Sequence, residues 1–506
     1  MAHQHRLTKC TTKPRIFVVS DISNEPDDAE SLIRLLLYGN EFDIRGLVPC
    51  TSCWMKSNVH PEDMHKIVDA YANVVGNLNS HVHPDNKYPS ATYLHSIIKP
   101  GPAVYGREAL RPGTPLSEGA QLLINQVNSS DDPLWVLVWG GTNVLAQALQ
   151  HVSESQPTSV METFTSKLRI YAISDQDDTG HWIRTTFPSL FYIVSLHAWK
   201  EYPMAAWTGI SGDLFAPIDN GAPDKTKITR EWLKKHIQIG PYGSTYPDYT
   251  FIMEGDTPTF LYLIQNGLGS CENPHWGSWG GRYGRVSLDA NLYSDVKDEV
   301  EVPRTAAKAF SNQATIWRWR DAFQDDFAAR MQWTLGADRA GVNHAPVVIV
   351  NGSSGPEYLY LEAEAGAVVT LDASATYDPD DDEVSFRWFQ YKEPTRTQCE
   401  VHWPFVPDVE FSIVNHEADV ERKPKGKGAV VTVHVPAAEA CAVDILKGEA
   451  LERGQTLHLI LEVKDSGIPC MRAYKRIVLQ TTNIAAKGAS GMTYETVTEA
   501  LEHMTR

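Results

Sequence analysis

The chain contains 506 residues, of which 42% are hydrophobic and 21% are charged, and its formal net charge is −18. This length exceeds what one hydrophobic core organises, so we expect two or three domains of ordinary composition. The negative charge repels phosphate backbones, and no apolar run reaches the ~18 residues of a membrane span, so neither nucleic acid nor a membrane is an expected partner. The N-terminal residues contain no apolar signal core, which predicts a cytoplasmic protein, or a secreted one if the N-terminus is truncated.

The first predicted strand runs directly into a group of carboxylates. Residues 15–20 form a short apolar run typical of a buried strand, and Asp21 follows it. Pro26 suits the first position of a helix, which places Asp27 and Asp28 in the first helical turn. Carboxylates packed this tightly repel one another unless a cation, a proton or a helix N-terminus compensates. A metal ion explains the group, and a favourable interaction with the helix dipole is the alternative for a single pair.

The same pattern, a short apolar strand followed by a polar loop, recurs along the chain. The further strands are predicted at residues 43–48, 134–138, 168–173, 191–194 and 249–253. Ligands of open α/β sheets bind outside the carboxyl ends of the strands, so the polar loops are expected to face one crevice. Oxygen ligands with little histidine indicate calcium or magnesium rather than zinc.

These segments resemble the nucleoside hydrolase fold, and they resemble still more closely the nucleoside hydrolase-like proteins of the cellulose-binding Sde182 type. The matching stretches are residues 20–28, 139–143, 173–178, 254–258 and 276–283, and together they cover most of residues 13–335. The resemblance implies a nucleoside hydrolase-like α/β domain over residues 14–338, with a mostly parallel sheet and flanking helices. Residues 1–13 would then form an N-terminal extension.

The resemblance also implies a calcium site. Asp28 matches the calcium ligand at the end of the nucleoside hydrolase motif, and Asp21 matches the opening aspartate. Asp256 matches the late aspartate that completes the metal site, and the carbonyl of Trp139 stands where that family uses a backbone oxygen. Asp27 matches the neighbour that contacts ribose. We therefore expect Ca²⁺ as the cofactor.

One position departs from the nucleoside hydrolase pattern. Spacing puts Ser23 where those enzymes place the aspartate taken as general base and second calcium ligand. A serine hydroxyl cannot remove a proton from water near neutral pH without a base beside it, so catalysis requires another carboxylate. The candidate catalytic residues are Glu25, Asp27, Glu254 and Asp175. A helix cap or a solvated position has equal weight as an interpretation of Glu25.

The aromatic content indicates a sugar or nucleoside substrate. Fourteen Trp and twenty Tyr residues are available, and aromatic faces stack on sugar rings and on bases. The glycine-rich, aromatic loop of residues 273–283 is predicted to form a binding lip. His181 or His275 is a candidate for protonating a leaving group, although a single histidine is more often a surface residue. The candidate substrate-binding residues are Asn24, Trp54, Asn143, Asp177, Asp178, His181, His275, Trp276, Trp279 and Arg282.

The sequence pattern changes near residue 340. Alternating strands are predicted at residues 367–371, 384–389, 429–435, 457–463 and 474–479, which favours an all-β sandwich over residues 345–482. Residues 372–383 resemble the strand and acidic turn of cadherin-like and polycystic-kidney-type immunoglobulin modules, with Trp388 as the inward aromatic. We expect the acidic turn to order the strands rather than hold calcium. Residues 483–506 form a C-terminal tail with a helix predicted at 494–503.

These observations lead to one functional hypothesis and one alternative. The hypothesis is a metal-dependent, glycoside hydrolase-like protein that cleaves an O- or N-glycosidic bond of a sugar held by Ca²⁺ through its hydroxyls. The alternative is a non-catalytic protein that binds a cellulose-type polysaccharide. The expected partner in both cases is a carbohydrate or glycoside, and a homo-oligomer is left open. A carboxylate within reach of the attacking water distinguishes the enzyme from the binding protein.

Overall fold

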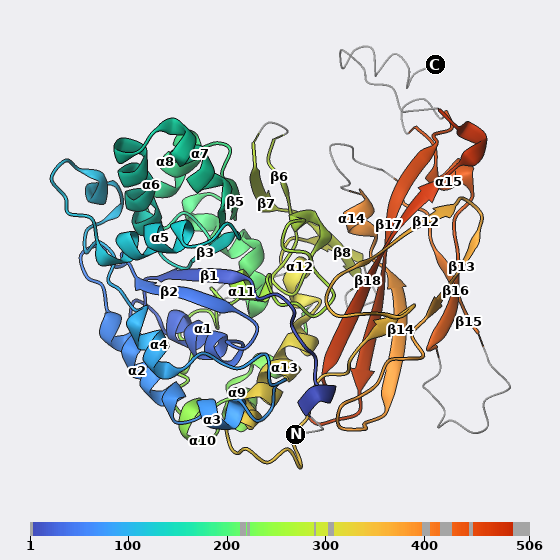
Figure 1. The fold of residues 1–506 in the computed structure, drawn as a ribbon, viewed down its shortest axis with the longest axis horizontal. Coiled ribbons are helices and arrows are strands. Elements are labelled where there is room, and N and C mark those ends of the chain that lie inside the picture. Colours follow the sequence, from blue (N-terminus) through green and yellow to red (C-terminus); the bar gives the residue numbers. More distant parts are fainter. Residues whose placement is uncertain are drawn as a thin grey trace. The chain divides into compact units, whose positions relative to one another are not determined.

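The computed structural model describes residues 4–212, 219, 223–287, 290–301, 308–396, 405–414, 428–444 and 449–488. The chain divides into two compact units (Figure 1). The first comprises Met1–Ile264 and Gly269–Asn343, and the second comprises Gln265–Leu268 and His344–Arg506. The chain therefore contributes a four-residue segment to the second unit well before the main boundary at residue 343.

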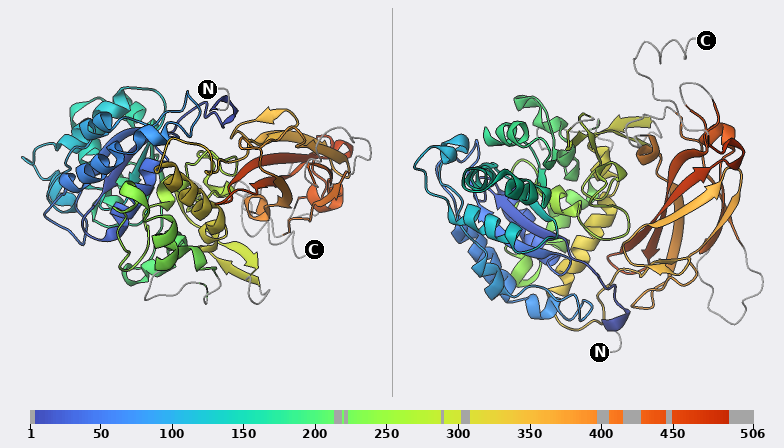
Figure 2. Two further views of the ribbon diagram at one scale, coloured as in Figure 1. Left: turned by 90° about the horizontal axis from the view of Figure 1, so that it is seen from below. Right: turned by 45° about the horizontal axis from the view of Figure 1, so that its top comes forward.

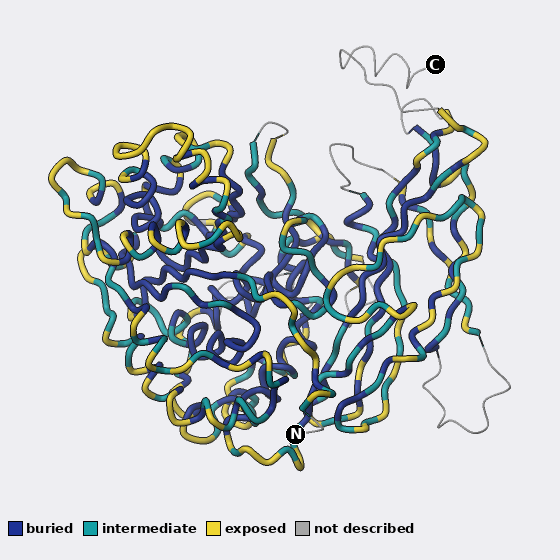
Figure 3. Tube along the Cα trace, in the orientation of Figure 1, coloured by how far each residue is buried: buried dark blue, intermediate teal, exposed yellow. Residues whose placement is uncertain are grey.

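A mostly parallel sheet forms the centre of the first unit. Its strand order is β2-β1-β3-β4-β5-β7-β6, and the pair β6–β7 is antiparallel. The strands are β1 (Arg15–Ser20), β2 (Asp43–Pro49), β3 (Leu134–Val138), β4 (Leu168–Ala172), β5 (Phe191–Val194), β6 (Tyr283–Arg285) and β7 (Leu292–Asp295). Every residue of β1 and β3 is buried, as expected for a sheet covered on both faces, and these strands lie within the dark blue interior in Figure 3. The predicted α/β fold is confirmed.

One predicted strand is wrong. Residues 249–253 do not form a strand, although their apolar composition resembles that of the neighbouring strands. The backbone N–H and C=O of Met253 bond to the Ser211 hydroxyl, at 3.2 and 3.1 Å, rather than to a sheet ladder. Ile252 and Met253 are buried, whereas Phe251 is 41% exposed, so the apolar residues of this segment are buried without strand pairing.

Helices cover both faces of the sheet. In Figures 1 and 2, α5 to α8 lie on one face, and α1 and α13 lie together on the other. The α-helices of the first unit are α1 (Pro26–Leu37), α2 (Pro61–Ala72), α3 (Val75–Leu78), α4 (Ala91–Ser96), α5 (Glu118–Asn128), α6 (Asn143–Ser155), α7 (Thr158–Ser166), α8 (Thr179–Thr186), α9 (Arg230–His236), α10 (Gly240–Gly243), α11 (Pro258–Leu261), α12 (Ala314–Trp317) and α13 (Arg320–Trp333). Pro26 occupies the start of α1 and Leu32, Leu35 and Leu36 are fully buried, as the sequence pattern predicts.

Shorter elements complete the first unit. The 3₁₀ helices are η1 (Gln4–Arg6), η2 (Gly106–Leu110), η3 (Trp199–Met204), η4 (Ala206–Ile210), η6 (Thr226–Ile228) and η7 (Pro274–Trp276). Strands β8 (Asp298–Glu301) and β9 (Lys308–Ser311) form an antiparallel pair. No described helix has both the length and the apolar content needed to cross a membrane.

Two β-sheets enclose the core of the second unit, and the predicted sandwich is confirmed. One sheet has the order β12-β18-β17-β14 and the other the order β13-β16-β15. The elements of this unit are β10 (Ile349–Val350), β11 (Ser353–Ser354), β12 (Leu359–Glu364), β13 (Val368–Asp372), β14 (Val384–Gln390), α14 (Lys392–Arg396), β15 (Glu410–Ile413), β16 (Val430–His434), α15 (Ala438–Cys441), β17 (Arg453–Asp465), β18 (Arg472–Thr482) and η8 (Ile484–Ala486). Their core includes Leu371, Val433 and Leu461.

Details of the second unit bear on two sequence expectations. Trp388 packs against the core, and its indole N–H donates to the carbonyl of Gly428 at 2.9 Å. The Asp378 carboxylate accepts hydrogen bonds from the backbone N–H groups of Asp380 and Asp382, at 2.8 and 3.1 Å. These bonds hold the acidic turn in shape. The helix predicted at residues 494–503 lies outside the described residues.

Candidate functional site

A cavity of about 270 Å³ opens at the carboxyl ends of the parallel strands. Its walls include Asp21 after β1, Trp139 after β3, Ser174 after β4 and His197 after β5. This is the place where open α/β sheets bind ligands, because the loops that follow neighbouring strands converge there. The predicted crevice and the observed cavity therefore coincide in position.

Three carboxylates form a close cluster in this cavity. One oxygen each from Asp27, Asp28 and Asp256 can be chosen so that all three lie within 4.8 Å of one another. Asp28 and Asp256 are buried, and Asp21 is buried in the wall of the same cavity. The first turn of α1 and the loop before α11 thus bring together carboxylates that are far apart in sequence.

Two glycines permit this crowding. A Cβ atom on residue Gly140 would lie 2.8 Å from Oδ1 of Asp21, and a Cβ atom on Gly255 would lie 2.8 Å from Oδ2 of Asp27. Such separations are shorter than van der Waals contact, so a larger residue at either position would displace the carboxylate. The local sequences around Trp139 and Asp256 are therefore adapted to the carboxylates that face them.

The electrostatics of the cluster call for a cation. Burial raises the pKa of Asp21 to about 6. Burial, followed by repulsion from Glu25 and Asp21, raises the pKa of Asp27 to about 8. Burial and mutual repulsion also raise the pKa values of Asp28 and Asp256 well above the ordinary range. A divalent cation would compensate this charge, whereas protons must do so in its absence.

The oxygen atoms available fit a hard metal ion. Oδ2 of Asp21 and Oδ2 of Asp256 are buried and accept no hydrogen bond from the described residues. The Trp139 carbonyl accepts a hydrogen bond from the Gln176 amide at 2.5 Å, which leaves a second lone pair for a ligand. Calcium takes six to eight oxygen ligands in flexible geometry, so this donor set suits it.

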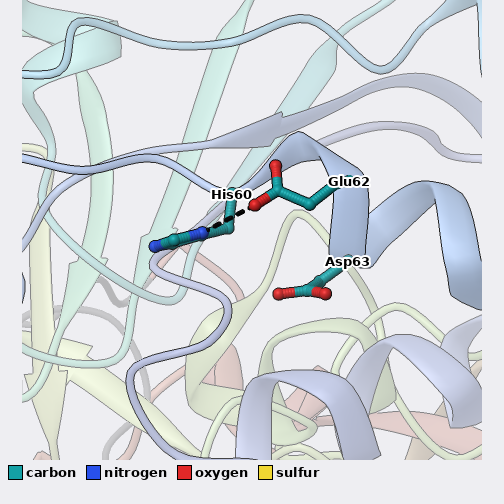
Figure 4. Close-up of side chains that lie close together, drawn as sticks. All are labelled: His60, Glu62 and Asp63. Atoms are coloured by element: carbon teal, nitrogen blue, oxygen red, sulfur yellow. Dashed lines mark hydrogen bonds and ion pairs between the residues drawn. The ribbon is translucent and has the colours of Figure 1, made fainter.

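Ser23 does not face the cavity. It adopts a left-handed backbone conformation, with φ of 82°, and its hydroxyl donates to the Asp63 carboxylate. Asp63 also pairs with Lys66 at 2.6 Å, beside the His60–Glu62 pair drawn in Figure 4. The position that carries the general base in nucleoside hydrolases therefore contributes no group to this cavity.

Glu25, Asp27 and Asp175 line the cavity, as a catalytic carboxylate must. Glu25 occupies the N-cap position of α1, but its side chain makes no capping hydrogen bond. Asp175 forms a two-pronged ion pair with Arg184, at 2.7 and 2.6 Å. The Asp175 carboxylate is therefore engaged by a guanidinium, although it lines the cavity.

The structure corrects the expectation for Glu254. Its side chain is fully buried outside the cavity, and it forms an ion pair with Arg34 at 2.6 Å. The Tyr246 hydroxyl also donates to it, at 2.7 Å. Glu254 adopts a left-handed conformation with φ of 56°, which turns its side chain away from the pocket that Asp256 lines. Its carboxylate is therefore engaged by Arg34 and Tyr246 and does not line the cavity.

Only two of the predicted substrate-binding residues, Asn24 and Trp54, line the cavity. Asn143 is buried, and its amide donates to the Thr51 hydroxyl at 2.9 Å. Asp177 is buried and accepts hydrogen bonds from Thr142 and Thr179. These polar residues follow their strands as predicted, but they are used to hold neighbouring loops together.

Other predicted contacts also lie outside the cavity. Asp178 accepts a hydrogen bond from the backbone N–H of Arg107 at 2.7 Å, and His181 is exposed on α8. The predicted lip does not line the cavity either, and its members include His275, Trp276, Trp279 and Arg282. Trp276 and Trp279 are buried, and Arg282 pairs with buried Asp298 at 2.7 Å. The aromatic and glycine content of this loop serves packing.

The segment after β5 supplies residues that the sequence analysis missed. His197, Trp199, Tyr202 and Trp207 from this segment all line the cavity. The indole of Trp199 stacks on that of Trp54, with ring centroids 5.9 Å apart and both side chains about 60% exposed. The strand at residues 191–194 ends at the same sheet edge as β1, so the carboxyl-end rule pointed to this segment.

Comparison with known proteins follows the same division of the chain. The acidic pocket at the carboxyl edge of a parallel sheet, together with a separate β-sandwich, defines a nucleoside hydrolase-like protein with an added all-β unit. Residues 15–283 match the family described as "Cellulose-binding Sde182, nucleoside hydrolase-like domain", and residues 368–481 match "Cellulose-binding protein Sde0182, C-terminal domain". The chain belongs to this Sde182 family.

One solved structure shares the fold of this chain over most of its length. A nucleoside hydrolase-related hypothetical protein from Saccharophagus degradans, associated with carbohydrate metabolism, is 28% identical. The alignment covers 93% of this chain and 100% of that one, with a TM-score of 0.72. An inosine-uridine preferring nucleoside hydrolase from Bacillus anthracis is 11% identical, and the alignment covers 64% of this chain and 100% of that one, with a TM-score of 0.31. No curated protein matches the chain.

Proposed function

We propose that the first unit is a calcium-dependent glycoside hydrolase that acts on a carbohydrate. The observation that carries this proposal is the cavity itself, whose lining includes both the cluster of Asp27, Asp28 and Asp256 and the exposed, stacked pair Trp54 and Trp199. Buried carboxylates suit a hard cation, and exposed aromatic faces suit sugar rings. The cellulose-binding description of the family agrees with this ligand class.

The residues that line the cavity would have different roles in the proposed hydrolysis. Asp21, Asp28 and Asp256, with the Trp139 carbonyl, would hold the ion, which when bound ligates sugar hydroxyls and stabilises negative charge on oxygen. Asp27 lies at the edge of the cluster and would accept a hydrogen bond from a sugar hydroxyl. Glu25 would take the proton of the attacking water, because it lines the cavity at the start of α1 without belonging to the cluster, whereas the Asp175 carboxylate is engaged by Arg184.

A non-catalytic carbohydrate-binding protein is the second candidate. It is favoured by Ser23, whose side chain bonds to Asp63 outside the cavity, so the base of nucleoside hydrolases has no counterpart at that position. Both candidates use the same pocket, and they differ only in whether Glu25 activates water.

Release of reducing sugar or aglycone tests the proposal. Nucleosides, aryl glycosides and cello-oligosaccharides are incubated with calcium or with chelator, using the wild type and Asp28→Ala. We expect turnover that requires calcium and is lost in Asp28→Ala. Absence of turnover on every substrate, with calcium-dependent oligosaccharide binding by calorimetry, would instead support the binding protein.

A further inference from the structure

His197 is the histidine that lines the cavity, among the residues that the structure describes. It follows β5, and both of its ring nitrogens have hydrogen-bond partners. Nδ1 lies 2.8 Å from the carbonyl oxygen of Ala198, and Nε2 lies 2.7 Å from Oγ of Ser174. Because a carbonyl oxygen can only accept, Nδ1 carries a proton, and the partner of Ser174 is therefore the nitrogen that gains or loses one.

Ser174 and His197 both line the cavity and contact each other. The Ser174 side chain is buried, with 6% exposure. The indole N–H of Trp207 donates to its oxygen at 3.1 Å. One acceptor site of the Ser174 hydroxyl is thus occupied permanently, and one acceptor site and one donor remain.

The protonation state of His197 decides what Ser174 offers. With neutral imidazole, the Ser174 hydroxyl donates to Nε2 and presents no proton to a ligand. With imidazolium, Nε2–H donates to Ser174, and together with the Trp207 indole it uses both acceptor sites of the oxygen. The hydroxyl proton then has no acceptor within this network, and it becomes available to a ligand in the cavity.

We propose that Ser174 is the catalytic acid of this site and that His197 is its proton source. This inference rests on the proposed hydrolysis and assigns the step that it leaves open, protonation of the leaving group. As the bond between the anomeric carbon and the leaving oxygen breaks, both bonding electrons stay on that oxygen, which takes the proton of Ser174. Ser174 takes the Nε2 proton of His197, water adds to the anomeric carbon, and Glu25 accepts the proton that water loses.

Two carboxylates are associated with the pair. Asp295 on β7 interacts electrostatically with His197 and is itself held by the Ser195 hydroxyl at 2.7 Å. Asp175 follows Ser174 in sequence, and its charge is balanced by Arg184. The loops of β4 and β5 carry Ser174 and His197, and the loop of β1 carries Glu25, so the proposed acid and base line one cavity from different loops.

Leaving-group dependence tests the assignment. The wild type, Ser174→Ala and His197→Gln are compared on a phenyl glycoside and a dinitrophenyl glycoside of the sugar that the wild type cleaves. The phenolate of the second substrate leaves without a proton, so only the first requires an acid. We expect kcat/KM to fall about 100-fold on the phenyl glycoside, with little change on the dinitrophenyl glycoside, and the alkaline limb of the pH profile to disappear.

Controls separate this result from damage to the fold. His151→Gln, at an exposed position on α6, should behave as the wild type on both substrates, and the calcium affinity of all variants should stay unchanged. Each variant should keep a cooperative thermal transition, and Ser174→Ala should melt at a somewhat lower temperature because it removes the acceptor of the buried Trp207 indole N–H. Equal losses on both glycosides, or no loss on either, would overturn the assignment while leaving the hydrolase intact. Absence of wild-type turnover even on the dinitrophenyl glycoside would overturn the proposed hydrolysis and this step with it.

Discussion

Glu25 is the carboxylate on which the proposed hydrolysis depends most directly. It lines the cavity beside the cluster of Asp27, Asp28 and Asp256 but is not a member of that cluster. Glu25 therefore lines the cavity without belonging to the group of carboxylates that would hold a metal ion. Its contribution to catalysis and its contribution to calcium binding are therefore separable by substitution.

Glu25→Gln preserves shape and removes the basic oxygen. We expect kcat to fall by roughly 100- to 10,000-fold, as for other general bases, with calcium affinity within about twofold of the wild type. Steady-state kinetics and calcium calorimetry on the same preparations measure the two quantities. Glu154→Gln, an exposed position on α6, is the matched control. Unchanged kcat in Glu25→Gln would assign the base to another residue.

Local hydrogen bonds explain why some site residues could be predicted and others could not. The carboxyl-end rule placed Asp21 and Asp28 correctly at the cavity, because their segment starts at the carboxyl end of β1. Asp256 also lines the cavity, but no strand directly precedes it, so only the family resemblance identified it. The rule does not specify where a side chain points. Asn143 and Asp177 follow strands in the same way, yet neighbouring threonine hydroxyls hold them outside the cavity.

At the level of elements, helix α1 joins the two parts of the carboxylate cluster. Its first turn carries Asp28, and its next turns carry Glu30 and Arg34, which hold the loop of Glu254. Glu30 accepts a hydrogen bond from the backbone N–H of Glu254 at 2.9 Å, and Arg34 pairs with the Glu254 side chain. Asp256 lies two residues further on, so α1 fixes the position of the cluster's remote member.

Removal of Glu254 should destabilise the first unit strongly. Glu254→Ala leaves the Arg34 guanidinium buried without its carboxylate, and breaking such a pair costs about 3–5 kcal/mol. Asp43→Ala, which breaks the half-exposed pair with Arg45, should cost less than about 1 kcal/mol. Urea denaturation of both variants compares the free energies of unfolding. Similar values for the two would show that the buried pair adds no stability.

Regular elements were predictable, and irregular ones were not. The strands that flank Asp21 and Trp139 were found because buried parallel strands are continuous apolar runs. The segment of η3 and η4 has no such period, so Trp199 and Trp207 were missed. The loop at residues 273–283 was wrongly predicted to form a binding lip, because tryptophan and glycine occur both in binding loops and in tightly packed loops.

At the scale of the whole molecule, the carboxylate cluster links stability to pH. Without a cation, Asp27 keeps its proton up to a pKa of about 8 in the folded chain, against an ordinary value of 3.8. The folded state then binds more protons than the unfolded state between these values, so stability falls as the pH rises from about 4 to 8. A bound divalent cation would remove this dependence, because it would replace the protons in compensating the negative charge.

Calcium binding should therefore release protons and tighten with increasing pH. We expect the metal-free protein to melt at a lower temperature at pH 8 than at pH 6, and saturating calcium to raise the melting temperature more at the higher pH. Calorimetry in buffers of different protonation enthalpy counts the protons released. Asp256→Asn, which removes a cluster member, should lose the calcium response. Heats of binding that do not depend on the buffer would contradict the linkage.

The division into an α/β unit and a β-sandwich was visible in the sequence, because the hydrophobic period changes near residue 340. The assignment of Gln265–Leu268 to the second unit could not be predicted from the sequence. This segment is held by hydrogen bonds to its backbone carbonyls within the second unit. The backbone N–H of Tyr474 donates to the Asn266 carbonyl at 2.9 Å, and the side-chain Nε of Arg476 donates to the Leu268 carbonyl at 2.6 Å. Contacts of this kind have no signature in composition.

Because residues 265–268 belong to the second unit, the two units cannot be exchanged by a single cut in the gene. A Cβ atom on Gly267 would lie 2.0 Å from the carbonyl oxygen of Tyr474, so even the glycine is matched to the strand it meets. A recombination event at residue 343 alone would join a sandwich to a foreign version of those four residues. The coding segments for the two units are therefore expected to be inherited together. Chimaeras between relatives should express well only when residues 265–268 and the β-sandwich come from the same parent.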